Sequence, residues 1–93
     1  SDLSQAELDK LCVVDRYPSD SIVFSSHGYD LHIDNELVAE AFSTLPQMEQ
    51  SILILHCTLD LADSEIGQIL ENDETIDSSL KILQRTVNSY LQQ

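Results

Sequence analysis

The stretch from Leu45 to Leu59 limits the fold more than any other part of the chain. It opens with Leu45-Pro46, and a proline is well tolerated in the first turn of a helix, where its missing N–H would have no partner. Apolar residues dominate the positions that follow, and together they cover more than one side of a helix. These residues are Met48, Ile52, Leu53, Ile54, Leu55, Cys57 and Leu59. A helix this apolar needs neighbours on several sides, so we expect it to be the central helix of the domain.

The size and charge of the chain set the next limits. Its 93 residues suit one small domain over residues 1–93. The chain has 17 Asp and Glu residues but only 4 Lys and Arg residues. The resulting net charge of −13 repels the phosphates of nucleic acids. No apolar run has the length of a membrane span, so we expect no membrane partner and a cytoplasmic protein. The chain begins at Ser1 and not at a methionine, which leaves open whether a longer natural protein contains it.

The two cysteines, Cys12 and Cys57, follow no known metal-binding or disulfide pattern. They are far apart in the chain and form no C-x-x-C motif, so neither a zinc site nor a disulfide framework is indicated. We expect two reduced thiols, as is usual in a cytoplasmic protein.

The N-terminal third of the chain predicts a short helix followed by a β-hairpin. Ser4 and Glu7 have the S-x-x-E spacing of a capping box, which indicates a helix over residues 4–14. Residues 22–33 alternate apolar and polar side chains on either side of a turn, where Gly28 supplies the positive φ that hairpin turns need. An isolated hairpin is marginal in water. We therefore expect this hairpin to pack on a helix or to pair with a second copy in a homodimer.

Residues 35–93 predict the helical part of the domain. Asp34 fits the N-cap of its first helix, and apolar residues follow on one face. That face consists of Leu37, Val38, Ala41, Phe42 and Leu45. After the central helix, residues 64–70 predict a short amphipathic helix. Its expected inward residues are Ile66, Ile69 and Leu70.

The last helix begins after a polar break, with Asp73 as its expected N-cap. Apolar residues then recur at steps of four and three, which is the spacing of one helix face. They are Ile76, Leu80, Leu83, Val87 and Tyr90, extended by Leu91. The sequence thus predicts a mainly α domain of four to five helices with one N-terminal β-hairpin.

In this part of the chain a helix that opens with proline is followed by a polar break, a short D-S-E-I-G-x-I-L helix, a tight turn and a final helix. This order of elements resembles region 4 of the sigma-70 family. It is most similar to the short sigma-like regulators of Gram-positive conjugative elements. The matching residues are Leu45-Pro46, Glu49, Ile52–Leu55, Leu61, Asp63–Gly67 and Ile69-Leu70. The resemblance implies a helix-turn-helix bundle and a bacterial transcription-related regulator that contacts promoter DNA or RNA polymerase. Its DNA-facing residues would be Thr75, Ser78, Ser79, Lys81 and Arg85.

The chain departs from this family where it should recognise DNA. The family turn carries a glycine and the last helix opens with several arginines, whereas residues 71–74 here read Glu-Asn-Asp-Glu. Ala62 stands where the family has a Ser or Thr N-cap. The alternative is an acidic protein-interaction domain that has lost DNA binding and engages a basic protein partner as a DNA mimic. Its partner-binding residues would be Glu71, Asp73, Glu74 and Asp77.

We expect no enzymatic activity, no metal site and no cofactor. Acid pairs such as Asp60 with Asp63 have the spacing of ordinary exposed charges. His56 and Cys57 diverge by about 100° on a helix, which is unsuited to binding one metal. We expect His56 at the edge of the core, hydrogen-bonded to a neighbour. The sequence contains no glycine-rich phosphate loop and no nucleophile elbow.

Overall fold

The computed structural model describes residues 10–13 and 21–92 of the chain. Its elements in order are β1 (Ile22–Ser26), β2 (Tyr29–Ile33), α2 (Glu36–Ser43), α3 (Gln47–Leu59), α4 (Asp63–Leu70) and α5 (Ile76–Leu91). The described part therefore contains four helices and one hairpin, which confirms the predicted mainly α class. The predicted helix over residues 4–14 lies mostly outside the described residues. Inside them, Val13 N–H donates to the Lys10 carbonyl at 2.9 Å and closes a turn.

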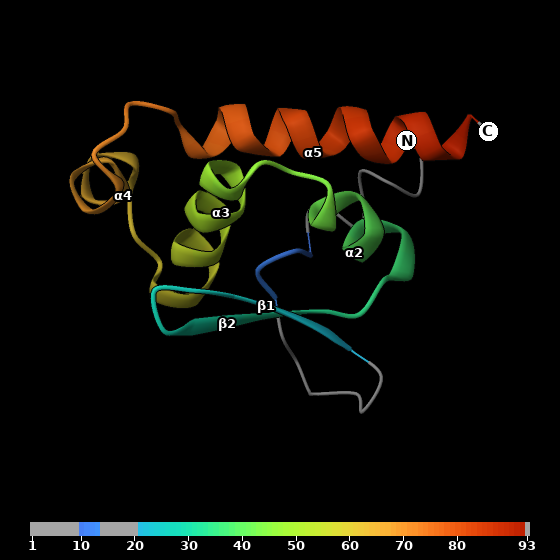
Figure 1. The fold of residues 1–93 in the computed structure, drawn as a ribbon, viewed down its shortest axis with the longest axis horizontal. Coiled ribbons are helices and arrows are strands. Elements are labelled where there is room, and N and C mark those ends of the chain that lie inside the picture. The colour runs from blue at the N-terminus through green and yellow to red at the C-terminus, as the bar shows by residue number, and fades with distance from the viewer. Residues whose placement is uncertain (1–9, 14–20, 93) are drawn as a thin grey trace.

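The central position predicted for α3 is confirmed. Figure 1 shows α3 between the hairpin on one side and α5 on the other, with α5 crossing above both α3 and α2. Four consecutive α3 residues, 52–55, are almost fully buried. A helix that packs against a sheet and two other helices has no free side for polar residues in its middle, which is why this stretch is so apolar.

The hairpin turns at His27-Gly28, where both residues have positive φ, 54° and 84°. Two such residues are typical of the tight two-residue turns that match the twist of paired strands. Leu31 and Ile33 of β2 face inward and are buried, as their alternation with polar residues predicted. At the end of β1, the Ser26 hydroxyl lies 2.8 Å from the Ser51 hydroxyl of α3. The hairpin therefore packs on a helix, one of the two predicted arrangements.

The N-cap of α2 is Asn35 and not Asp34, so that prediction was wrong by one residue. The Asn35 side-chain oxygen accepts the Val38 N–H at 3.0 Å. Either polar residue could cap a helix on sequence grounds. The hydrogen bond from the Val38 N–H to the Asn35 side chain identifies Asn35 as the cap.

The predicted N-cap of α5, Asp73, was also wrong. Asn72 accepts the Glu74 N–H at 2.7 Å and forms a turn that delays the start of the helix. The cap is Thr75, whose hydroxyl accepts the Ser78 N–H at 3.0 Å. Local side-chain hydrogen bonds thus decide where this helix begins.

Two residues predicted to face inward are instead exposed. Ile69 and Leu91 each keep 47% of their surface in solvent. Ile66 is buried and Leu70 is half-buried, so α4 turns Ile69 to its outer side. Leu91 is the last residue of α5, where the helix ends.

The expectation of two reduced thiols was wrong, because Cys12 and Cys57 form a disulfide. Their Cα atoms lie 4.6 Å apart although 45 residues separate them in sequence. Leu11 is buried in the core and brings Cys12 to the last turn of α3. The two cysteines come together only in the folded chain, so no sequence motif predicts their disulfide. In the described part of the chain, no helix is both long and apolar enough to cross a membrane.

Candidate interaction site

The turn between α4 and α5 is tight. Glu71 ends α4 in the left-handed region, with φ of 53°, a conformation that glycine adopts most easily. Asn72 N–H donates to the Gly67 carbonyl at 3.1 Å, and a Cβ on Gly67 would lie 2.9 Å from the Asn72 carbonyl oxygen. Gly67 therefore permits the close approach of the backbone at Asn72.

The starts of α4 and α5 are linked directly. The Asp63 carboxylate accepts the Ile76 N–H at 2.8 Å, which satisfies an amide that has no partner within α5. Ala62 offers no side-chain cap to α4, but Glu65 accepts the Ala62 N–H at 2.9 Å. One half of a capping box thus remains at the α4 start. Together these contacts fix how α5 leaves the turn.

The apolar seam of α5 faces the domain core. Leu83 and Val87 are fully buried, and the other seam residues are half-buried against the same core. Those others are Ile76, Leu80 and Tyr90. The inner side of α5 is thus occupied within the domain, and only its outer side can meet a partner.

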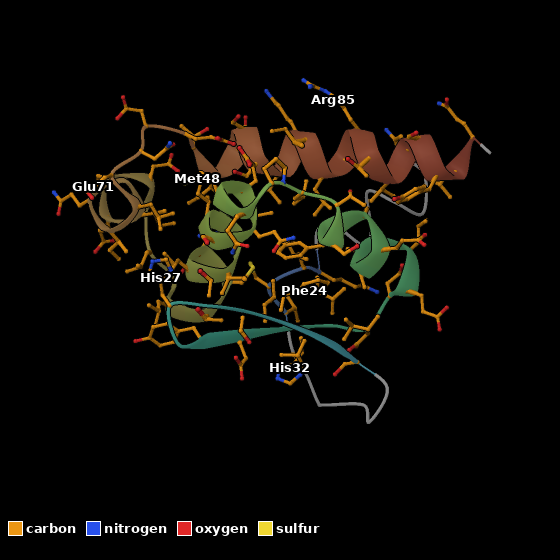
Figure 2. All side chains as sticks on the ribbon, viewed as in Figure 1. Phe24, His27, His32, Met48, Glu71 and Arg85 are labelled. Atoms are coloured by element: carbon orange, nitrogen blue, oxygen red, sulfur yellow. A yellow bond between two sulfur atoms is a disulfide. The ribbon has the colours of Figure 1, made fainter. Side chains whose placement is uncertain are left out.

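The predicted DNA-facing residues do not all lie on that outer side. Lys81 and Arg85 are exposed, and Figure 2 shows Arg85 pointing away from the body of the domain. Thr75 is exposed as the N-cap, and Ser78 is half-buried. Ser79 is fully buried, so its assignment as a DNA-facing residue was wrong. The seam spacing could have shown this, because Ser79 precedes Leu83 by four residues on the same face.

Acidic side chains surround the start of α5. We call Glu71, Asp73, Glu74 and Asp77 the acidic corner. Glu71, Asp73 and Asp77 are exposed, and Figure 2 shows Glu71 at the end of α4. The one ion pair among the described residues joins Asp77 to Lys81 at 3.2 Å. This pair partly neutralises one of the two cations on the outer side of α5.

Glu74 differs from the other members of the acidic corner. It is half-buried, and the Ser79 hydroxyl donates to its carboxylate at 3.3 Å. A hydrogen bond with Glu49, partial burial and repulsion from Glu49 raise its pKa above the usual 4.5, and the bond from Ser79 opposes the rise. Sequence reasoning missed Glu49, because nothing in the spacing of residues 49 and 74 predicts their contact.

The histidines take structural roles. His56 Nδ1 lies 3.1 Å from the Leu61 carbonyl oxygen, which confirms the predicted hydrogen-bonded histidine at the edge of the core. His27 Nδ1 lies 2.8 Å from the Ser26 hydroxyl. Within residues 10–13 and 21–92, no three His, Cys, Asp or Glu side chains gather as a metal site would require.

Comparison with known proteins adds no family assignment. Neither the family models, nor the curated proteins, nor the solved structures give a match to this chain. The structure itself defines a mainly helical domain with an N-terminal hairpin and an acidic corner at the start of its last helix.

Proposed function

We propose that this chain is a transcription-related protein-interaction domain that engages a basic protein partner through the acidic corner. In this proposal α4, the tight turn and α5 form a helix-turn-helix of the sigma region 4 type. The left-handed turn at Glu71 and the bond from Asp63 to Ile76 support that assignment. We place its action in a bacterial cytoplasm, with RNA polymerase among the candidate partners.

The charge at the start of α5 carries the proposal. In helix-turn-helix proteins the first residues of the second helix enter the major groove and pass close to phosphates. Here the turn before α5 presents the exposed carboxylates of Glu71 and Asp73, and the first turn of α5 presents that of Asp77. Carboxylates repel phosphates and attract a basic protein surface. The same geometry that would position DNA therefore selects a cationic protein.

A charge-neutralised variant tests this function. In the variant Glu71→Gln, Asp73→Asn and Asp77→Asn, the corner keeps its shape and loses its charge. A matched control removes the same charge from another exposed face, with Asp34→Asn, Glu36→Gln and Glu40→Gln. A photo-crosslinker at residue 73 identifies the partner in a bacterial lysate, and the purified partner is then titrated with both variants.

We expect the corner variant to lose binding and the control to retain it. Equal binding by both variants, or an equal loss in both, would show that the corner is not the interface.

A second candidate is direct contact with promoter DNA, which one observation favours. Lys81 and Arg85 are exposed one helical turn apart on the outer side of α5. Two cations can contact two phosphates, whereas ordinary duplex affinity rests on several such contacts. Titration of duplex DNA with the chain and with the variant Lys81→Ala, Arg85→Ala decides between the candidates.

A homodimer is a further expected partner. Val23 and Tyr29 of the hairpin are exposed, and among the described residues each of the two strands has one edge without a strand partner. The molar mass from light scattering tests this part of the proposal, with Val23→Lys as the variant that should restore the monomer.

A further inference from the structure

A single covalent bond attaches residues 10–13 to the body of the domain. Cys12 is joined to Cys57 in the last turn of α3, and the Cα atoms of the pair lie 4.6 Å apart. Figure 1 draws this short segment in blue. The Val13 N–H donates to the Lys10 carbonyl, so this backbone hydrogen bond closes a turn within the segment and does not reach the other elements. The disulfide is therefore the strongest link between these residues and the rest of the fold.

One side chain of the segment enters the core. Leu11 keeps 6% of its surface exposed and belongs to the main buried cluster, whereas Lys10, Cys12 and Val13 are exposed. Fixing the backbone of four residues costs more free energy than the burial of one leucine side chain returns. Without the disulfide, the docked position of residues 10–13 is therefore less stable than the released one.

The body of the domain has a core of its own. The other buried members of the cluster that contains Leu11 come from residues 31–87, mostly in β2, α2, α3 and α5. These elements pack directly on one another: α3 contacts the hairpin and α5, and α2 contacts α5. Loss of Leu11 from the cluster should therefore release residues 10–13 while the rest of the domain stays folded.

The two ends of the disulfide differ in exposure. Cys12 is exposed and Cys57 is half-buried, so a small thiol approaches the bond from the side of Cys12. Its thiolate attacks Sγ of Cys12, the S–S bond breaks, and Cys57 leaves as a thiolate that takes up a proton. A second thiolate attacks the thiol-derived sulfur of this mixed disulfide and frees Cys12, which is protonated in turn. Two small thiols are thus oxidised to their disulfide, and the protein disulfide accepts two electrons and two protons.

We propose that the Cys12–Cys57 disulfide is a redox clasp. The closed clasp docks residues 10–13 on the core, and reduction by a small thiol such as glutathione opens it and releases them. The clasp depends on neither the acidic corner nor its partner. In the bacterial cytoplasm that the proposed function assumes, thiols are kept reduced, so the clasp is open at rest and oxidation closes it. Only this resting state rests on the proposed function.

Methyl NMR of Leu11 tests the clasp in the intact chain. The chain is equilibrated with mixtures of reduced and oxidised glutathione, from fully oxidising to fully reducing. On reduction we expect the Leu11 methyl signals to move to solvent-like shifts and the protection of the Val13 amide against hydrogen exchange to fall about tenfold. The methyl signals of Leu83 and Val87, which are fully buried, should keep their native shifts. Oxidised glutathione should restore the first state.

Two variants hold the clasp open. Cys12→Ser removes the sulfur that the thiol attacks, and the double variant with Cys57→Ser removes both thiols. In both, the Leu11 signals should be solvent-like at every glutathione ratio. Val13→Ala is the control, because it alters an exposed neighbour and keeps both cysteines, and it should respond as the wild-type chain does. If the variants do not fold, the titration of the wild-type chain decides alone.

Several results would overturn the clasp. Leu11 signals that stay core-like after reduction would show that the segment docks without the disulfide. Loss of the native Leu83 and Val87 signals together with those of Leu11 would make the disulfide a support of the whole domain. Reduction by a phosphine but not by glutathione would show that small thiols do not reach the bond. Retained partner binding by the variant of the acidic corner would instead contradict the proposed function and leave the clasp standing.

Discussion

The Asp63 carboxylate accepts the backbone N–H of Ile76 at 2.8 Å, across 13 residues of chain. This bond joins the first residue of α4 to the first residue of α5, and it satisfies an amide at a helix start where negative charge is favoured. We predict that Asp63→Ala lowers the free energy of unfolding by about 1 kcal/mol. Urea denaturation monitored by circular dichroism measures the loss.

The neighbouring Ser64→Ala is the matched control, because Ser64 is exposed on the same helix. Its effect should stay within about 0.5 kcal/mol. Equal stabilities for Asp63→Ala and the wild-type chain would mean that water replaces the carboxylate at no cost.

Glu71 adopts a left-handed conformation that glycine accepts without steric cost. We predict that Glu71→Gly stabilises the domain by about 0.5–1 kcal/mol, since relief of the backbone strain exceeds the added entropy of the unfolded chain. The midpoint of thermal unfolding should rise. Asp73→Gly, at a residue without positive φ in the same turn, should lower it.

Gly67 has no room for a side chain. An added Cβ would lie 2.9 Å from the Asn72 carbonyl oxygen, and this neighbour is backbone that cannot rotate away. Alanine is the better helix former by about 1 kcal/mol, so helix propensity alone predicts stabilisation. We predict the opposite for Gly67→Ala, a destabilisation of about 1–3 kcal/mol in chemical denaturation. Gln68→Ala, exposed on the same helix, should be nearly neutral.

The disulfide between Cys12 and Cys57 closes a loop with a sequence separation of 45. Chain entropy predicts that such a crosslink contributes about 4 kcal/mol. Reduction with a phosphine should therefore lower the urea midpoint of the wild-type chain. The double variant Cys12→Ser, Cys57→Ser should have the same urea midpoint as the reduced protein, and the reductant should not change that midpoint. A wild-type midpoint that does not change on reduction would show that the thiols are unpaired in solution.

Periodicity predicted the elements whose burial repeats along the chain. The core face of α5 at Leu83 and Val87, the buried middle of α3 and the inward residues of β2 all follow from spacing. In each case a regular element turns the same side toward one layer of the domain. The spacing also predicted that Ile69 faces inward, and this was wrong. With about two turns, α4 has too few apolar residues to define one inward face.

Features that join distant parts of the chain could not be predicted. The contact of Glu49 with Glu74 and the bond from Asp63 to Ile76 depend on how helices are placed in space. The cap at Thr75 is a local feature, and the sequence did not single it out because neighbouring polar residues compete for that position. The four residues of the acidic corner were therefore named from the sequence, whereas the contacts that position them became visible only with the tertiary structure.

The central claim is that the start of α5 meets a basic protein and not DNA. Fluorescence anisotropy of a labelled duplex pool, at roughly 50 mM salt where phosphate contacts are strongest, tests it most directly. We predict no saturable binding by the wild-type chain. Saturable binding that is lost in the variant Lys81→Ala, Arg85→Ala would contradict the claim and establish DNA contact through the outer side of α5.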